Sequence, residues 1–255
     1  MPVRRQNLEE WFTDHQLQAL HRNHFHIPAH LDFDVSKLVA AYAEQDRRLP
    51  ITAVMVKAMA LLAKKHPEVN RTIFRTFLGT WVVEFDHIDV NVPVMIEHEG
   101  RRVLSATVVK DADTKTVAQI NDEVKVASQR NLADLPIGSH FIANRNNLWN
   151  RTKLRLIHWA VWNLPWLYLS KRGGGMAVSS IVQPTAPGFQ LRVVSRGPHV
   201  WTIGLWTLEA DENGRHILRA GVGYDHSALG GEAFITTTHS LNGILNGDSG
   251  LDELL

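Results

Sequence analysis

The hydrophobic and polar positions of the chain follow two periods, one typical of helices and the other of strands. Apolar residues that recur about every 3.6 positions predict amphipathic helices. We expect them over residues 6–24, 36–44 with Ser36 as the cap, 52–65 with Thr52 as the cap, and 114–128. A last helix follows the glycine pair at 230–231, with its apolar side made by Phe234, Leu241, Ile244 and Leu245.

Shorter runs are β-branched or alternate polar and apolar residues, and these predict strands. They cover residues 30–35, 80–85, 88–96, 102–109, 176–182, 190–195, 200–209 and 217–224. Helices and strands are mixed without the strict alternation of a doubly wound sheet. We therefore predict an α+β fold with a mixed sheet flanked by helices. Because no repeat or Pro/Gly/Ser-rich linker divides the chain, one domain is expected over residues 1–255.

Composition narrows the class of protein. The 255 residues are 44% hydrophobic, and 27 basic side chains balance 26 acidic ones, so no basic field for nucleic acid is present. Cysteine is absent, which excludes disulfides, thiolate metal sites and cysteine nucleophiles. The start, MPVRRQNLEEWF, lacks the apolar core of a signal peptide, and the longest apolar stretch, 156–169, is too short to span a bilayer. A cytoplasmic protein is expected.

The densest group of chemistry-bearing residues is GYDHSALGG, residues 223–231. Asp225 and His226 end a β-branched strand and precede a glycine-containing turn, a place where reactive groups are commonly held. A polar strand end with ordinary turn glycines has the same pattern. Phosphate loops ending in Gly-Lys-Ser/Thr, His-Glu-x-x-His and Gly-x-Ser-x-Gly do not occur.

GYDHSALGG resembles the active-site motif of the dihydrolipoyl acyltransferase catalytic domain, the core component of 2-oxoacid dehydrogenase complexes. In that family a strand ends in Ser-Tyr-Asp-His-Arg, followed by Asp or Asn, Gly-Ala and a helix. Further segments resemble the family in the same order: HIPAHLDFDVSKL, ITAVMVKAMALLAKKHPEVN, IDVNVPVMIEHEGRRVLSATVVKDADTKTVAQI, GGGMAVSS, PHVWTIG and the C-terminal LDELL. The resemblance covers residues 26–130 and 173–255.

The resemblance implies a chloramphenicol acetyltransferase-like fold and acyl transfer from a thioester carrier. His226 takes the role of general base, for which an imidazole with a pKa near the operating pH is suited. Ser179, or its neighbour Ser180, takes the role of the hydroxyl that stabilises the oxyanion. The supporting residues are Tyr224, Asp225, Gly230 and Gly231. Coenzyme A or a pantetheine-bound acyl carrier is the expected cosubstrate, without a metal. The family assembles as homotrimers or higher multiples, with the site between subunits.

Three positions depart from the family pattern. Gly230 stands where the family has Asp or Asn, Ser227 replaces an arginine, and Ala177 replaces a threonine. These departures leave open a catalytically weakened or silent trimeric scaffold subunit of a multienzyme assembly. A relative of condensation domains fits less well, because their two-histidine motif is absent. The chain shows no lipoyl domain, so a stand-alone transferase is expected that receives its acyl group from coenzyme A, a separate carrier protein or a separate lipoyl group.

Residues 131–172 form a Trp-rich helical insertion without a counterpart in the family pattern. Four of the eight tryptophans fall between 149 and 166, and an apolar stripe with basic flanks is made by Leu154, Ile157, Val161 and Leu164. Three interpretations fit: a helix buried in the core or at a subunit interface, a wall for a long or aromatic acyl chain or a carrier contact, and a helix lying on a membrane surface. Residues 149–169 are therefore a candidate for contact with a partner or a membrane.

Histidines at 21, 24, 26 and 30 invite a metal-site interpretation. His26 and His30 lie on either side of Pro28 and cannot share a helix face, and no carboxylate completes an obvious ligand set. We predict surface or core histidines here.

Overall fold

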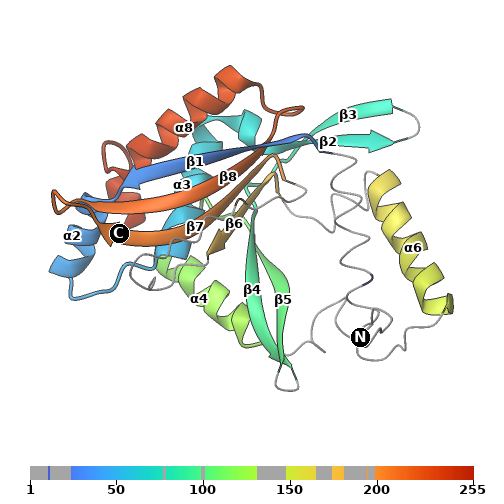
Figure 1. Ribbon diagram of the computed structural model, residues 1–255, viewed down its shortest axis with the longest axis horizontal. Helices are drawn as coiled ribbons and strands as arrows, with labels where there is room; N and C mark the ends of the chain where they lie inside the picture. Colours follow the sequence, from blue (N-terminus) through green and yellow to red (C-terminus); the bar gives the residue numbers. More distant parts are fainter. Residues whose placement is uncertain are drawn as a thin grey trace, which may run out of the picture.

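The computed structural model describes residues 24–76, 79–98, 101–130, 148–164, 174–180 and 199–255, with the single positions 11 and 194. Its centre is a six-stranded sheet in the order β1-β8-β7-β6-β4-β5 (Figure 1). The strands are β1 (His26–Asp34), β4 (Val90–His98), β5 (Arg101–Val109), β6 (Met176–Ser180), β7 (Trp201–Ala210) and β8 (His216–Asp225). β6 runs parallel to both its neighbours and the other pairs are antiparallel. The predicted mixed sheet is confirmed.

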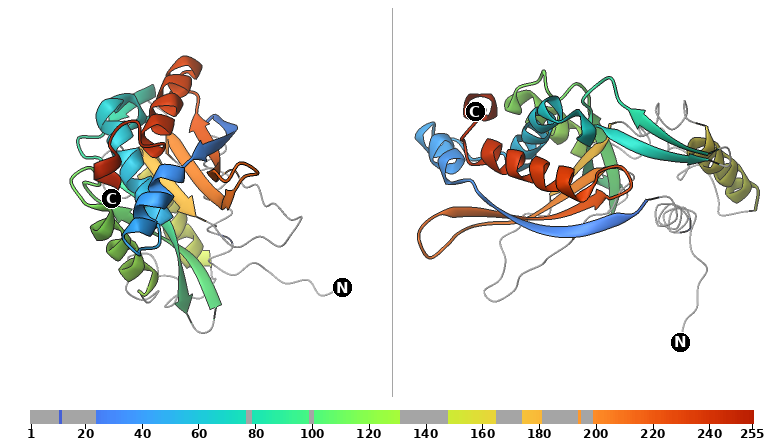
Figure 2. Two further views of the ribbon diagram at one scale, coloured as in Figure 1. Left: turned by 90° about the vertical axis from the view of Figure 1, so that its left-hand side faces the viewer. Right: turned by 90° about the horizontal axis from the view of Figure 1, so that it is seen from above.

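Four helices lie on one face of this sheet, as the view from above shows (Figure 2). They are α2 (Ser36–Glu44), α3 (Ile51–Lys65), α4 (Val117–Ser128) and α8 (Gly231–Leu245). α3 packs between α4 and α8 and against β6, which is why it is apolar nearly all round and mostly buried. The predicted apolar side of α8 is confirmed, because Phe234, Leu241, Ile244 and Leu245 are buried.

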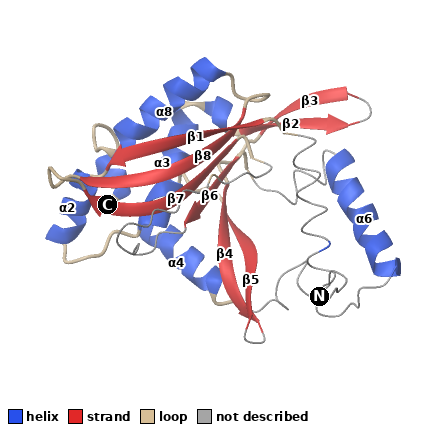
Figure 3. Cartoon of the chain, viewed as in Figure 1, coloured by secondary structure: helices blue, strands red, loops and turns tan. Residues whose placement is uncertain are grey.

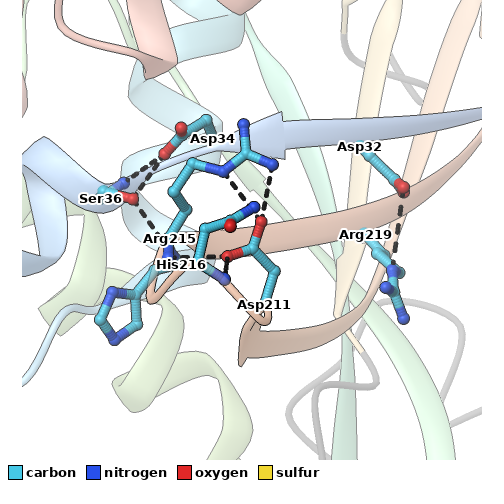
Figure 4. A network of polar contacts seen from close by, with 8 residues as sticks. Asp32, Asp34, Ser36, Asp211, Arg215, His216 and Arg219 are labelled. Carbon is cyan, nitrogen blue, oxygen red and sulfur yellow. Dashed lines mark hydrogen bonds and ion pairs between the residues drawn. The ribbon is translucent and has the colours of Figure 1, made fainter.

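The expected helix caps are wrong at two positions. Val35 and Pro50, rather than Ser36 and Thr52, precede the first helical residue of α2 and α3. The Ser36 hydroxyl instead donates to Asp34 Oδ1 at 2.6 Å and accepts the His216 N–H at 2.8 Å, as the polar network at this end of the sheet shows (Figure 4). Ser36 therefore ties the end of β1 to the start of β8.

One strand was missing from the expected set. β2 (Arg71–Thr76) follows the short 3-10 helix η1 (Pro67–Val69) and pairs with β3 (Gly79–Glu84) in a hairpin that projects from the body (Figure 1). Its sequence RTIFRT is short and has an arginine at its first and fifth positions, so the strand pattern is weak. α6 (Leu148–Asn163) packs against β2.

Several predicted segments lie outside the described residues. They are the helix at 6–24 apart from Trp11 and His24, the parts of the insertion at 131–147 and 165–172, and the strand at 190–195 apart from Val194. No helix in the part of the chain that the structure describes is long and apolar enough to cross a membrane.

Glycines determine how the chain enters β6. A Cβ on Gly174 would lie 2.1 Å from the Asp89 carbonyl oxygen, and one on Gly175 would lie 2.8 Å from the Arg71 backbone nitrogen. The Asn70 side chain donates to two carbonyls of the loop before β4 and lies 3.4 Å from the Gly175 nitrogen, whose N–H donates to Oδ1. These contacts hold β6, which carries Ser179, beside β4, and only glycine fits them.

Candidate active site

His226 follows the last residue of β8 and lies at the surface. The strand behind it is buried, with Tyr224 6% and Asp225 0% exposed, whereas the His226 side chain is exposed. The backbone N–H of His226 donates to the Phe25 carbonyl at 2.8 Å. The Asp225 carbonyl accepts the N–H groups of Ala228 and Leu229 at 3.0 and 2.9 Å, which closes the turn. A rigid backbone thus presents an imidazole to solvent.

The Asp225 carboxylate holds this loop from beneath. Oδ1 accepts the N–H of Ser227 at 3.0 Å and of Phe25 at 3.2 Å, and Oδ2 accepts Nδ1–H of His24 at 2.8 Å. Burial raises the pKa of Asp225, but the hydrogen bond and electrostatic attraction of His24, with the Ser227 N–H, outweigh it and leave the pKa below its ordinary value. The charged carboxylate therefore joins the residues before β1 to both sides of His226.

His24 has a carboxylate partner that the sequence pattern did not reveal. It is buried, and its partner Asp225 lies 201 residues further along the chain. The β1–β8 register pairs His26 with Asp225, so the residues just before β1 must meet the end of β8. The sequence pattern predicted that this strand begins at residue 30, whereas β1 begins at His26. The contact between His24 and Asp225 was therefore not predicted.

The neighbouring histidines have structural partners. His26 Nε2–H donates to the His199 carbonyl at 3.2 Å, and His199 Nδ1–H donates to the Gly174 carbonyl at 3.0 Å. These tautomers follow because a carbonyl only accepts. The His30 ring lies 5.1 Å from the Trp206 ring. Among the described residues no group of three or more metal-binding side chains is arranged to hold an ion; His21 lies outside them.

Arg71 holds the loop from the opposite side. Its Nε and Nη2 groups both donate to the Ala228 carbonyl, at 3.0 and 2.5 Å. Sequence reasoning missed this residue, although it directly follows Asn70 of the family's Pro-x-x-Asn pattern. The loop around His226 is thus fixed by β1, β2 and β8 together.

The other predicted supporting residues lie beside the loop. The Tyr224 ring stacks on Phe234 of α8 at 3.8 Å and lies 6.0 Å from the His226 ring. Gly230 is the N-cap of α8 and is exposed, and a Cβ on Gly230 or Gly231 would meet nothing within 4 Å. Neither glycine is required by steric crowding.

The structure does not bring the predicted serines to His226 within one chain. Ser179 and Ser180 are half-buried on β6, where Ser179 pairs with Gly204 of β7, which pairs with Gly221 of β8. His226 lies five residues beyond Gly221, which at about 3.3 Å per residue is roughly 17 Å along the sheet. Two strand spacings add about 10 Å across it. A hydroxyl and an imidazole at this separation cannot act on one carbonyl.

Comparisons with known proteins agree with this architecture. Residues 13–134 match the family model described as 2-oxoacid dehydrogenases acyltransferase (catalytic domain). The dihydrolipoyllysine-residue acetyltransferase component 3 of the mitochondrial pyruvate dehydrogenase complex of Arabidopsis thaliana is 31% identical over 88 residues, 34% of this chain and 15% of that protein. The chain thus matches a small part of that relative's length.

Solved structures show the same fold over nearly the whole chain. The dihydrolipoamide acetyltransferase of Azotobacter vinelandii superposes with a TM-score of 0.63 at 16% identity, covering 98% of this chain and 93% of that one. A truncated catalytic core of the 2-oxoacid dehydrogenase multienzyme complex from Thermoplasma acidophilum gives 0.64 at 14%, covering 98% and 99%. The fold class is therefore that of acyltransferase cores, as expected. Over residues 13–134 the sequence is also similar to the 2-oxoacid dehydrogenases acyltransferase catalytic domain, and the fold agrees with that similarity.

Proposed function

We propose that the protein is an acyltransferase that moves an acyl group between a thioester carrier and an acceptor, with His226 as the general base. The observation that carries the proposal is the exposed His226 imidazole on a backbone held by Asp225, Phe25 and Arg71. A general base needs both access to its substrate and a defined position. His226 has both, in the fold of acyltransferase cores.

The proposed chemistry follows from this placement. The neutral imidazole takes the proton of the attacking thiol, and the sulfur adds to the acyl carbonyl carbon. The negative oxygen of the tetrahedral intermediate accepts a hydrogen bond from the Ser179 hydroxyl, with Ser180 as the neighbouring alternative. Collapse expels the carrier thiolate, which takes the proton back from the imidazolium. Coenzyme A, a carrier protein or a lipoyl group supplies the thioester, and no step requires a metal.

The proposed site lies between subunits. Since Ser179 is roughly 20 Å from His226 in its own chain by strand spacing, a serine within reach must come from the partner subunit. A cyclic homotrimer or a higher multiple of it supplies one such contact for each chain. The neighbours described as a cubic core and as a catalytic core of multienzyme complexes support an assembly of this kind.

The test is thiol release from acetyl-, longer-acyl- and aromatic-coenzyme A esters, with and without added acceptor thiols and amines. His226→Ala is expected to lower kcat by about 10²–10⁴-fold, the range that a positioned base contributes. His239→Ala removes another exposed histidine, on α8, and is the matched control that leaves turnover unchanged. Equal turnover of wild type and His226→Ala, with folding and assembly intact, would exclude this role.

A second candidate function is a catalytically silent trimeric scaffold. Gly230 favours it: the Azotobacter enzyme was studied for the catalytic roles of a serine, a histidine and an asparagine four residues after that histidine, and glycine provides no side chain here. The space beside Gly230 is open, so the fold itself does not exclude a longer residue. A wild-type protein that neither binds nor turns over any of the thioesters would be the scaffold.

The single domain over residues 1–255 and the cytoplasmic location stay predictions.

A further inference from the structure

α6 carries an apolar face that points away from the body of the protein. Leu154 and His158 are buried on its inner side. Four large apolar residues on the outer side are more than half exposed: Leu148 at 79%, Trp149 at 75%, Leu156 at 63% and Trp159 at 54%. At about 100° per residue they fall within an arc of about 100°, roughly opposite Leu154 and His158. The arc also contains Thr152 and Asn163, whose side chains donate to the helix carbonyls of Leu148 and Trp159. We call this arc the outer face of α6.

The position of α6 in the fold leaves this face open. α6 stands apart from the four helices that cover the sheet and contacts the β2–β3 hairpin (Figure 3). Burial of the insertion in the core of the chain, one interpretation of its sequence, is therefore wrong for this helix. Ile157, a member of the apolar stripe in the sequence, is 45% exposed. An exposed apolar face of this kind indicates a binding partner outside the chain.

Basic side chains border the outer face on both edges. Exposed Arg155 lies about 20° outside one edge of the arc and exposed Lys153 about 40° outside the other. The guanidinium carbons of Arg151 and Arg155 each lie 5.4 Å from the centroid of the Trp11 ring, which keeps Arg155 at this edge. The helix contains no acidic residue. Its charge is thus complementary to an anionic surface.

We propose that the outer face of α6 docks the protein on an anionic membrane surface. The leucines enter the outermost acyl region, and the tryptophans lie at the headgroup level, where this side chain is enriched. Lys153 and Arg155 extend along the helix and reach the lipid phosphates. A helix lying flat needs one apolar arc with basic borders, and α6 presents this arrangement away from the protein.

Flotation with vesicles tests the proposal on the intact protein. One set is phosphatidylcholine alone and the other is phosphatidylcholine mixed with phosphatidylglycerol. Wild type is expected to float with the mixed vesicles and to be released by salt. The double variant Trp149→Glu/Trp159→Glu is expected to lose about tenfold or more of its partitioning. Val126→Glu/Ile235→Glu changes two exposed apolar residues on other helices and is expected to bind like wild type.

A charge variant distinguishes electrostatic attraction to anionic lipids from nonspecific hydrophobic adsorption. Lys153→Glu leaves the outer face intact and should weaken binding to the mixed vesicles. Circular dichroism confirms that each variant is folded. The proposal is overturned if wild type binds neither vesicle, or if Lys153→Glu or the tryptophan variant binds as wild type does. A further contradicting result combines two measurements: wild type does not bind vesicles, and light scattering shows that wild type is an assembly whereas the tryptophan variant is dissociated. The outer face is then an interface between copies of the chain.

Discussion

Asp225 is the residue on which the geometry of the His226 loop most depends. Its buried carboxylate accepts three hydrogen bonds, from His24 and Phe25 just before β1 and from Ser227 just after β8. Removing the charge of a buried carboxylate is costly when it accepts several hydrogen bonds, because each donor loses a charged acceptor and stays desolvated. Asp225 therefore links the stability of the fold to the position of His226.

Asp225→Asn is expected to lower the free energy of unfolding by about 2–3 kcal/mol at pH 7, because hydrogen bonds to a charged acceptor are replaced by weaker ones. The folded-state pKa of Asp225 lies below its unfolded value near 3.9, so the stabilisation is full above that value and is lost as pH falls through the folded pKa. The difference between wild type and variant should therefore shrink below about pH 4. Urea unfolding over a pH series measures it.

Asp248→Asn is the control for this measurement. Asp248 pairs with Lys37 at 3.1 Å on the surface, where both side chains are more than half exposed. Such pairs contribute about 0–1 kcal/mol, so this variant should change little at any pH. A difference for Asp225→Asn that is the same at every pH would contradict the assigned role.

At the scale of elements, β6 is the strand whose entry tolerates the least change. It pairs with β4 and β7 and carries Ser179, and the glycines before it touch the backbones of Arg71 and Asp89. The same junction includes Asn70, beside the arginine that holds the His226 loop. A displacement of β6 therefore disturbs both halves of the proposed chemistry.

Gly174→Ala places a methyl group 2.1 Å from a backbone oxygen that cannot move alone. We expect a loss of about 3 kcal/mol in the free energy of unfolding, the upper end of the range for overpacked sites. Gly243→Ala is the matched control, because Gly243 lies within α8 and a Cβ there meets nothing within 4 Å. It should stabilise by about 0.5–1 kcal/mol. Denaturant unfolding measures both, and a Gly174→Ala variant as stable as wild type would show that the junction relaxes.

At the scale of the whole molecule, the proposed mechanism assigns His226 and Ser179 of one chain to two different active sites. His226 and its supports lie at the end of β8, while Ser179 lies several residues back along the sheet. Each subunit of a cyclic assembly would then give its histidine to one site and its serine to the next. Under the proposed mechanism, turnover would therefore require the assembly.

Mixed assemblies test this arrangement. Neither His226→Ala nor Ser179→Ala alone should turn over, but co-expression of the two in equal amounts should restore activity. Random mixing leaves about a quarter of the sites with an intact histidine and an intact serine, because the two residues come from different chains. Thiol release by the purified mixed assembly measures it. No recovery, with mixing shown by differently tagged subunits, would contradict a site between subunits.

The sequence alone determined the features that rest on local pattern. The periods of 3.6 and 2 predicted α3, α4 and α8 and most strands of the sheet, since side-chain spacing within one element decides which face is buried. The motif GYDHSALGG predicted His226 at a strand end, because its parts are neighbours in the chain. Ser179 was placed on a strand for the same reason.

Only the tertiary structure decided the contacts between distant segments. The His24 ring meets Asp225 because β1 pairs with β8, and Arg71 meets the Ala228 carbonyl because of where the short strand β2 begins. The distance between Ser179 and His226, and the outward direction of the apolar face of α6, depend on how elements pack. A local pattern contains no information on which remote segment covers it, since that choice is made by the burial of the whole chain.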